Sequence, residues 1–405
     1  MKCLEKLKKY NQEHLLKYLD ELSDDQKEKL DKQILATDFS YLKYIGKEQE
    51  KSLAKITPIE ALTVEQIEQN KKEYYQIGIN SLKNGEVGAL LLAGGMGTRL
   101  GSDNPKGMYN VGITRDLYIF ECLFNNALDV VKQVGKPFPF FIMTSEKNDK
   151  TTREFLKEHN YFGYDEKYIR FFVQDMAPCT DIDGNILLEQ KDRLATSPNG
   201  NGGWFNSLLN NKQAKQLFDD SNVKWLNIFA VDNVLQKIAD PVFVGATIKH
   251  NSQIGAKVIR KVDAYEKVGV MCKKDGKPSI IEYIDLGEEM ANQTNENGER
   301  LYNFGVILNY LFNVDLLYEI KDKSLPVHVV TKKIEYVNSD GIVTKPETPN
   351  GHKFEMLCVD MIELGQTCLP FEVEREKEFA PIKNKTGVDS VESARSLLEK
   401  NGVVL

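Results

Sequence analysis

The stretch from Leu91 to Gly107, LLAGGMGTRLGSDNPKG, contains the residues of this chain that are best suited to chemistry. Glycine lets backbone N–H groups approach a bulky anion, because no Cβ holds the anion off. Arg99 and Lys106 add two positive charges beside those N–H groups. Bare backbone donors with an arginine and a lysine suit the phosphates of a nucleoside triphosphate. We interpret the stretch as a phosphate-binding loop built on four glycines, Gly94, Gly95, Gly97 and Gly101.

The spacing within this loop excludes two common phosphate-binding motifs. The dinucleotide fingerprint G-x-G-x-x-G requires a glycine at position 100, which is Leu100. A Walker loop requires a lysine followed by Ser or Thr, whereas Lys106 is followed by Gly107. The alternative interpretation is a tight turn between a strand and a helix, but Arg99 and Lys106 favour a ligand site.

The residues AGGMGTRLG followed by PKG resemble the signature of the eukaryotic-type UDP-sugar pyrophosphorylases, and most closely that of the UDP-N-acetylglucosamine pyrophosphorylases. The resemblance spans roughly Val87 to Lys383, and its motifs occur in one order: YFG, FFVQDM, NGNGG, FAVDN, IIEY, KPETPNG and APIKN. It implies an α/β fold of the nucleotide-diphosphosugar transferase (Rossmann-like) type, in which a mixed sheet is flanked by N-terminal helices and a small C-terminal element.

The resemblance also implies a reaction, the transfer of a uridylyl group. N-acetylglucosamine 1-phosphate attacks the α-phosphorus of UTP in line, giving UDP-N-acetylglucosamine and pyrophosphate. The nucleophile is already an ionised phosphate oxygen, so no catalytic base is required, and positioned cations and N–H donors carry the reaction. We expect Arg99 and Lys106 to act on the triphosphate. Lys383 matches a lysine that contacts the α-phosphate or the sugar phosphate.

Further site residues are implied by matching positions. The nucleotide site is implied at Leu92, Ala93, Gly94, Gly95, Gly97, Gln174, Gly200, Asp232 and Lys353. The sugar site is implied at Asn201, Glu282, Tyr283 and Asn303. The chain departs from the family pattern at Val306, where a sugar-contacting Asn is usual, and at Met96, where Gln is usual. Two alternatives stay open: a pyrophosphorylase for UDP-glucose or for several UDP-sugars, and a nucleotide-sugar binding protein without activity.

Three motifs have a second interpretation from their residues alone. Asp232 follows a predicted strand, Lys224 to Val231, and a carboxylate there suits Mg²⁺ or Mn²⁺ beside a triphosphate. A lone Asp could instead cap the helix expected near Pro241. The segment 199–203 could surround a sugar or a base, or form a surface turn. Glu282 and Tyr283, on a predicted strand, could accept sugar hydroxyls or lie on an exposed strand face.

Composition limits the class of protein and its partners. Hydrophobic residues make up 41% and charged residues 28% of the 405 residues, as in ordinary globular proteins. The net charge of −7 argues against a nucleic-acid partner, and no apolar run is long enough for a membrane span. The N-terminus lacks the apolar core of a signal peptide, and the six scattered cysteines form no C-x-x-C pair. We therefore expect a cytoplasmic protein with reduced thiols and no nucleic-acid or membrane partner. The resemblance implies small-molecule partners, UTP and a sugar 1-phosphate, and we expect a monomer or weak dimer.

The expected elements place these residues on an α/β framework. Residues 1–85 are predicted to be helical, with capping boxes at Ser23 and Thr63. From Val87, strands and helices alternate as in a parallel sheet: strands at 87–92, 137–144, 168–173 and 224–231, with helices at 117–134, 149–159 and 204–218. Asn148 or Asp149 is expected to cap the second of these helices.

Later strands are predicted at 268–273, 279–284, 302–308, 333–337 and 371–374, with a loop ending at Lys353 and a closing helix at 391–399. Lys274, Asp275 and Gly276 predict a hairpin turn. The predicted domain borders are 1–85, 86–320 and 321–405. This sequence is expected to lack the longer C-terminal extension common in eukaryotic relatives, which leaves open any oligomer contacts made by that extension.

Overall fold

The computed structural model describes residues 1–47 and 54–405. It divides into two compact units that are each assembled from separate segments of the chain. Unit 1 is made of Met1–Ser52, Gln174–Gly203 and Ser324–Cys358, and unit 2 of Leu53–Val173, Trp204–Lys323 and Val359–Leu405. The predicted borders at 85/86 and 320/321 do not coincide with these units, because each unit is completed by segments far apart in the sequence.

Unit 2 is organised by one mixed sheet, which has ten strands within the described residues. Its main path runs β1-β12-β14-β10-β2-β3-β4, and β11, β13 and β19 pair along it. The strands are β1 Ile56–Pro58, β2 Val87–Leu92, β3 Phe140–Thr144, β4 Ile169–Val173, β10 Trp225–Ala230, β11 Ile254–Arg260, β12 Val270–Lys274, β13 Lys277–Ile281, β14 Phe304–Asn313 and β19 Cys368–Glu372. The parallel strands predicted from their apolar runs, β2, β3, β4 and β10, are confirmed.

The register of the parallel strands brings their carboxyl ends to one edge. Leu92 pairs with Met143 of β3 and with Ala230 of β10, and Thr144 pairs with Val173 of β4. The loops that follow β2, β3 and β10 therefore leave the sheet side by side. This is the edge where open α/β sheets bind their ligands.

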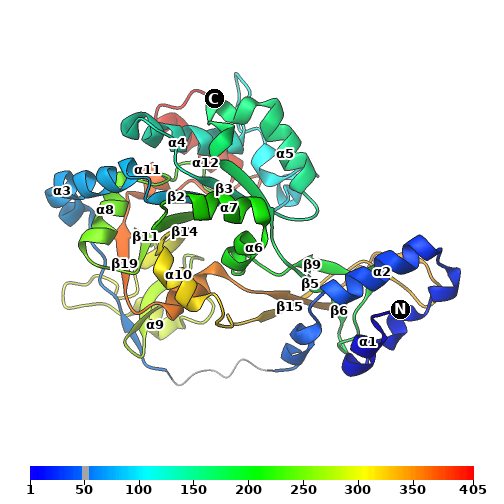
Figure 1. Ribbon diagram of the computed structural model, residues 1–405. Helices are drawn as coiled ribbons and strands as arrows, with labels where there is room; N and C mark the ends of the chain where they lie inside the picture. The colour runs from blue at the N-terminus through cyan, green and yellow to red at the C-terminus, as the bar shows by residue number, and fades with distance from the viewer. Residues whose placement is uncertain (48–53) are drawn as a thin grey trace. The chain divides into compact units, whose positions relative to one another are not determined.

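Helices cover both faces of the sheet (Figure 1). Successive side chains of a strand point to opposite faces. Phe140 of β3 stacks on Phe124 of α4 with ring centroids 5.2 Å apart, whereas Phe141 packs against Phe218 of α7 at 6.0 Å. The helices of unit 2 are α3 Val64–Lys83, α4 Ile119–Val134, α5 Asp149–Glu158, α6 Trp204–Asn210, α7 Lys212–Asp220, α8 Pro241–Lys249, α9 Glu288–Asn292, α10 Val314–Ile320, α11 Arg375–Glu378 and α12 Val391–Lys400.

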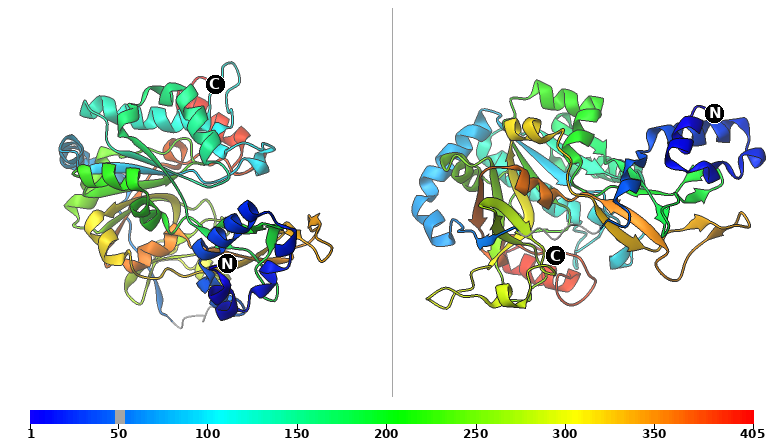
Figure 2. Two further views of the ribbon diagram at one scale, coloured as in Figure 1. Left: turned by 45° about the vertical axis from the view of Figure 1, so that its right-hand side comes forward. Right: turned by 90° about the horizontal axis from the view of Figure 1, so that it is seen from below.

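Unit 1 combines N-terminal helices with short strands. It contains α1 Leu4–Tyr10, α2 Asp24–Ala36, β5 Met176–Pro178, β6 Thr180–Asp181, β7 Leu188–Gln190, β8 Arg193–Leu194, β9 Thr196–Pro198, β15 His328–Lys332, β16 Tyr336–Val337, β17 Val343–Thr344 and β18 Gly351–Glu355. The views in Figure 2 show the β16–β17 segment beside the first helices, and the Tyr18 hydroxyl donates a 2.8 Å hydrogen bond to the Asn338 carbonyl. Leu7, Leu30 and Leu194 belong to its apolar core.

The helical prediction for residues 1–85 is confirmed apart from the short β1, except that residues 48–53 lie outside the described residues. Both predicted capping boxes form, at Ser23 before α2 and at Thr63 before α3. The prediction of a cap by Asn148 or Asp149 is wrong, because no side chain caps the start of α5. The Asn148 side chain bonds to the loop after β2 instead.

Three other predictions of local structure need correction. The helix expected at 204–218 is two helices, because Asn211 interrupts it and caps α7. The strand expected at 333–337 does not form as one strand, because β15 ends at Lys332 and β16 begins at Tyr336. Lys353 lies within β18 and not at the end of a loop.

The predicted hairpin turn is confirmed between β12 and β13, where Asp275 and Gly276 both have positive φ. However, β13 ends at Ile281, so Glu282 directly follows the strand and Tyr283 begins a turn. Within the described residues, no helix is both long and apolar enough to cross a membrane.

Candidate active site

The glycine-rich loop leaves β2 at Leu92 and folds back on itself. The Gly97 N–H donates to the Asn104 carbonyl at 2.8 Å, and the Lys106 N–H donates to the Gly95 carbonyl at 3.1 Å. These two hydrogen bonds pair the two ends of the motif, so Lys106 lies next to the backbone of Gly95. Backbone pairing thus explains why residues about ten positions apart belong to one site.

The glycines of the loop differ in whether the surrounding protein requires glycine at their position. A Cβ at Gly107 would lie 2.3 Å from the Phe120 ring, so the packing of the loop on α4 requires glycine there. A Cβ at Gly95 would find no protein atom within 4 Å, and φ at Gly95 is not positive. The protein itself therefore gives no reason for glycine at position 95.

The two lysines and the arginine of the site lie close enough to influence one another. The Lys106 ammonium is 3.8 Å from the Asp232 carboxylate, and the two side chains are only 17% and 22% exposed. Burial lowers the pKa of Lys106 from its ordinary value. The charge of Asp232 opposes this shift, whereas the charges of Lys383 and Arg99 reinforce it. Arg99, Lys106, Asp232 and Lys383 thus form one electrostatic cluster, and Arg99 itself is exposed.

Asp232 and Lys383 are brought to this cluster by a backbone connection between two loops. The Ile382 N–H donates to the Asp232 carbonyl at 2.9 Å, and the Val234 N–H donates to the Ala380 carbonyl at 3.3 Å. The Lys383 ammonium donates to Asp389 at 3.0 Å.

Asp232 does not cap α8. Asp240 accepts the hydrogen bond from the Val242 N–H that closes the start of that helix. The alternative of a capping role for Asp232 is therefore wrong.

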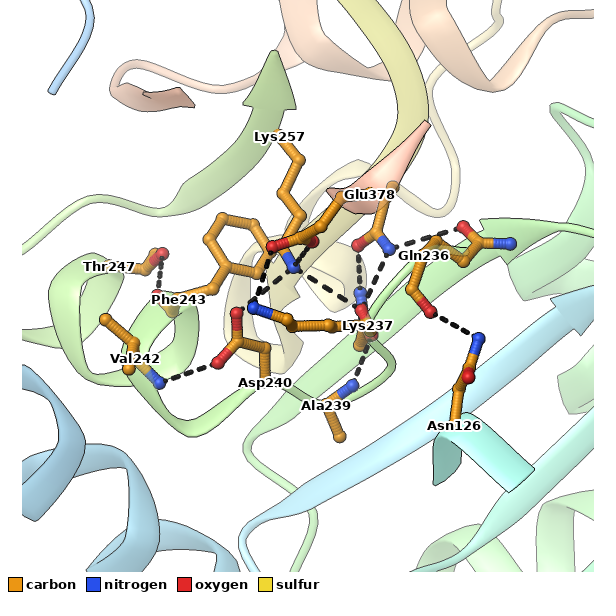
Figure 3. A network of polar contacts seen from close by, with 12 residues as sticks. Asn126, Gln236, Lys237, Ala239, Asp240, Val242, Phe243, Thr247, Lys257 and Glu378 are labelled. Carbon is orange, nitrogen blue, oxygen red and sulfur yellow. Dashed lines mark hydrogen bonds and ion pairs between the residues drawn. The ribbon is translucent and has the colours of Figure 1, made fainter. Parts of the chain in front are cut away.

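A buried polar network fixes the loops that carry Asp232 and Lys383 to the sheet (Figure 3). The Lys257 side chain is fully buried, and its ammonium lies 2.5 Å from Glu378 Oε2 and 3.2 Å from Asp240 Oδ2. Lys237 approaches the other oxygen of Glu378 at 3.3 Å. Burial alone raises the pKa of Asp240, but the charges of Lys257 and Lys237 outweigh it and hold that pKa below its ordinary value.

The network continues through neutral side chains. Asn233 donates to the Glu378 carbonyl at 2.8 Å and accepts from the Ala380 N–H at 2.9 Å. Asn126 of α4 donates to the Gln236 carbonyl at 3.0 Å. Because Asn233 directly follows Asp232, these bonds restrict the loop that carries the carboxylate.

The predicted nucleotide and sugar residues Gln174, Gly200, Asn201 and Lys353 belong to unit 1. The segment 199–203 packs on the end of β18. A Cβ at Gly200 would lie 2.2 Å from the Met356 carbonyl oxygen, and the Gly202 N–H donates to that oxygen at 2.8 Å. The Asn201 carboxamide oxygen accepts from the Cys358 N–H at 2.8 Å. Gln174 is buried directly after β4.

The predicted sugar residues Glu282, Tyr283 and Asn303 belong to unit 2. Tyr283 is 41% exposed. Asn303 is buried, and its carboxamide oxygen has no hydrogen-bond donor within the part of the chain that the structure describes. A buried acceptor without a donor is uncommon in proteins and is compatible with a ligand hydroxyl. Val306 lies three residues further along the chain, in β14.

Two residues were not predicted to belong to this site, Ser145 and Asn148. The Ser145 hydroxyl donates to the Gly94 carbonyl at 2.9 Å, and the Asn148 amide donates to the Ala93 carbonyl at 2.9 Å. Their sequence signal was available, because both follow β3 at the edge where the glycine-rich loop leaves β2. The prediction assigned Asn148 to helix capping instead.

All six cysteines lie in the described ranges, and none of them forms a disulfide bond. Burial raises the pKa of most of these thiols, to about 12 at Cys122 and about 11 at Cys272. Such thiols stay protonated and are poor nucleophiles.

Comparison with known proteins places this arrangement in a family. The model of the UTP–glucose-1-phosphate uridylyltransferase family matches residues 37–404. The UDP-N-acetylglucosamine pyrophosphorylase of Saccharomyces cerevisiae is 35% identical, and the match covers 98% of this chain and 86% of that protein. UDP-N-acetylglucosamine diphosphorylase 2 of Arabidopsis thaliana is 32% identical, with 98% and 82% covered.

A solved structure agrees with this result. The crystal structure of the uridine diphosphate N-acetylglucosamine pyrophosphorylase from Trypanosoma brucei, in complex with an inhibitor, superimposes with a TM-score of 0.82 at 25% identity. The match covers 98% of this chain and 83% of that one. The expected fold, a mixed α/β sheet of the UDP-sugar pyrophosphorylase type, is confirmed. This chain belongs to the UTP–glucose-1-phosphate uridylyltransferase family.

Proposed function

We propose that this chain transfers a uridylyl group from UTP to N-acetylglucosamine 1-phosphate and releases pyrophosphate. The observation that carries the proposal is the cluster of Arg99, Lys106, Asp232 and Lys383 beside the glycine-rich loop, at the carboxyl edge of β2 and β10. This cluster occurs in a chain whose relatives, covered over most of their length, are named for UDP-N-acetylglucosamine.

In the proposed reaction, an oxygen of the sugar phosphate forms a bond to the α-phosphorus of UTP. The bond from that phosphorus to the bridging oxygen breaks, and pyrophosphate leaves with the electron pair. The charge that develops on the phosphoryl oxygens needs donors that are fixed beforehand. The loop N–H groups and Lys106 supply such donors for the triphosphate, and Lys383 can contact both reactants.

The donor set also fits a divalent cation, Mg²⁺ or Mn²⁺, held partly by the substrate. Asp232 offers one partly buried carboxylate beside the cluster. The described residues contain no group of three His, Cys, Asp or Glu side chains that could hold a metal alone. The remaining ligands would be phosphate oxygens and water, as is usual for Mg²⁺. A bound cation would neutralise part of the charge of the triphosphate.

The test is pyrophosphate release from the purified chain. UTP and ATP are each combined with the 1-phosphates of N-acetylglucosamine, glucose and N-acetylgalactosamine. We expect the highest kcat/KM for UTP with N-acetylglucosamine 1-phosphate. A preference for glucose 1-phosphate would assign the chain to UDP-glucose, and thermal stabilisation by UTP without pyrophosphate release would indicate a binding protein.

Two variants test the assigned residues. Lys106→Met and Arg99→Ala should each lower kcat/KM about 10²–10³-fold, the usual effect of losing one fixed donor. Lys132→Met, at a lysine of α4 whose side chain is 74% exposed, is the matched control for loss of a positive charge. Normal turnover in both test variants would refute the assignment.

The cytoplasmic location and the monomeric or weakly dimeric state belong to the same proposal. Size-exclusion chromatography with light scattering tests the oligomeric state of the purified chain. A stable assembly larger than a dimer would contradict that part of the proposal.

A further inference from the structure

Ser145 and Asn148 hold the carbonyl side of the glycine-rich loop. Ser145 is 2% exposed and Asn148 is fully buried. Besides the bonds to Gly94 and Ala93, the Asn148 amide donates to the Gly95 carbonyl at 3.4 Å. The Asn148 carboxamide oxygen accepts from the Ser145 N–H at 2.8 Å, which fixes the two residues to each other. Two side chains from the loop after β3 therefore bind three consecutive carbonyls of the loop after β2.

The direction of these carbonyls determines the direction of the N–H groups. A trans peptide is planar, and its C=O and N–H point to opposite sides. When the carbonyls of Ala93, Gly94 and Gly95 point toward Ser145 and Asn148, the N–H groups of the residues that follow each of them point away. These are the N–H groups of Gly94, Gly95 and Met96.

These three N–H groups are available to a ligand. In the described part of the chain, none of them donates to a backbone carbonyl of the turns and loops. Gly95 is exposed, and Gly94 and Met96 are partly exposed. Three adjacent donors beside Lys106 are arranged for an anion.

We propose that Ser145 and Asn148 are positioning residues, which fix the N–H groups of the glycine-rich loop in the orientation that binds the triphosphate. This inference rests on the proposed function and adds the device that orders its phosphate site. Neither side chain needs to touch the substrate, since each acts through a loop carbonyl. A purely structural role would mean that they only stabilise the turn after β3.

Thr144, the last residue of β3, provides the matched control. It is fully buried, and its hydroxyl oxygen lies 2.5 Å from an Asp149 carboxylate oxygen and 3.2 Å from the Phe172 carbonyl oxygen, so its one proton is donated to these acceptors. Its hydrogen bonds stabilise the same turn but do not reach the glycine-rich loop. Thr144→Val therefore removes buried hydrogen bonds of the turn without changing the contacts of the loop carbonyls.

The experiment compares Ser145→Ala, Asn148→Ala and Thr144→Val with the unmodified chain. It measures the melting temperature, the dissociation constant for UTP by calorimetry, and kcat and KM for each substrate from pyrophosphate release. We expect all three variants to melt at lower temperature. Ser145→Ala should weaken UTP binding about 3- to 10-fold, the range for one net hydrogen bond, and Asn148→Ala should weaken it on the order of 10²-fold. Ser145→Thr, which keeps the hydroxyl, should restore UTP binding.

The pattern across substrates separates the possible results. The positioning role predicts that KM for the sugar phosphate stays within about twofold of the unmodified value, because the loop N–H groups bind the nucleotide. It also predicts that Thr144→Val leaves the UTP constants unchanged.

If Ser145→Ala and Asn148→Ala keep normal UTP binding and differ only in melting temperature, the inference is wrong although the function stands. If the unmodified chain releases no pyrophosphate and binds no UTP, the proposed function fails first. Should Asn148→Ala not fold, the Ser145 variants decide the question.

Discussion

The most informative single perturbation is Gly95→Ala. Gly95 is exposed, its φ is not positive, and a Cβ there would meet no protein atom within 4 Å. The fold therefore tolerates a methyl group at this position. The added methyl would instead take up open space at the surface of the loop, where the proposed ligand binds. The substitution thus separates a glycine needed by a turn from a glycine needed by an anion.

The expected magnitudes follow from these contacts. Replacing glycine by alanine where the backbone is compatible changes stability by less than about 1 kcal/mol and often increases it, because the unfolded chain loses freedom. Holding the triphosphate away from loop donors should resemble the loss of one fixed donor, which lowers the rate about 10²–10³-fold. We expect Gly95→Ala to lose on the order of 10²-fold in kcat/KM for UTP while its melting temperature stays the same or rises.

The assay combines pyrophosphate release with thermal unfolding, and Gly107→Ala is the opposite control. A Cβ at Gly107 would lie 2.3 Å from the Phe120 ring, so that variant should lose about 1–3 kcal/mol of stability through overpacking. If Gly95→Ala keeps normal kcat/KM for UTP with an unchanged melting temperature, the loop does not bind the triphosphate as argued.

Four further predictions concern the site and its surroundings. Lys257→Met leaves two buried carboxylates without their main cation and should lower the free energy of unfolding by about 3–5 kcal/mol in chemical denaturation; an unchanged value would contradict the network. Because burial lowers the pKa of Lys106, kcat/KM for UTP should fall on the alkaline side at a pH below the ordinary lysine pKa. In Asp232→Asn, the remaining kcat/KM should fall at a still lower pH, because the Asp232 charge raises the pKa of Lys106. A fall at a higher pH would contradict the interaction between Asp232 and Lys106. Gly245→Ala should lower the free energy of unfolding by at least about 1–3 kcal/mol, because a Cβ there would lie 1.7 Å from the Tyr74 carbonyl oxygen, where α3 and α8 pack. An unchanged free energy of unfolding in thermal denaturation would contradict this close packing.

The sequence predicts the parallel part of the sheet well because its strands are short apolar runs between clear turn signals. The run from Val87 to Leu92 becomes β2, which is buried at every position. The glycine-rich loop, Arg99 and Lys106 could be proposed as a phosphate site because their residue types have few other uses together, and the structure places Lys106 near Asp232. The position of Asp232 after a strand was predicted, but its closeness to Lys106 depends on the pairing of β2 with β10, which the sequence pattern does not give.

Other features depend on contacts that a linear pattern does not encode. Unit 1 joins the N-terminal helices to segments more than 300 residues away, so no local signal marks its borders. Glu282 and Tyr283 directly follow the apolar residues of β13, but pairing with β12 ends at Ile281. Lys257 within the buried β11 and Asn148 before α5 are polar residues whose partners lie on other loops. The sequence shows that these polar side chains stand among apolar or loop residues, but it does not show which residues they bond to.

The central claim is that the loop after β2 binds the phosphates of the nucleotide. A crystal structure of this chain with bound UDP-N-acetylglucosamine tests it most directly. We predict that the diphosphate lies within hydrogen-bonding distance of the N–H groups of Gly94, Gly95 or Met96, with Lys383 also in contact with it. A diphosphate bound elsewhere, with those three N–H groups facing solvent or protein, would contradict the account.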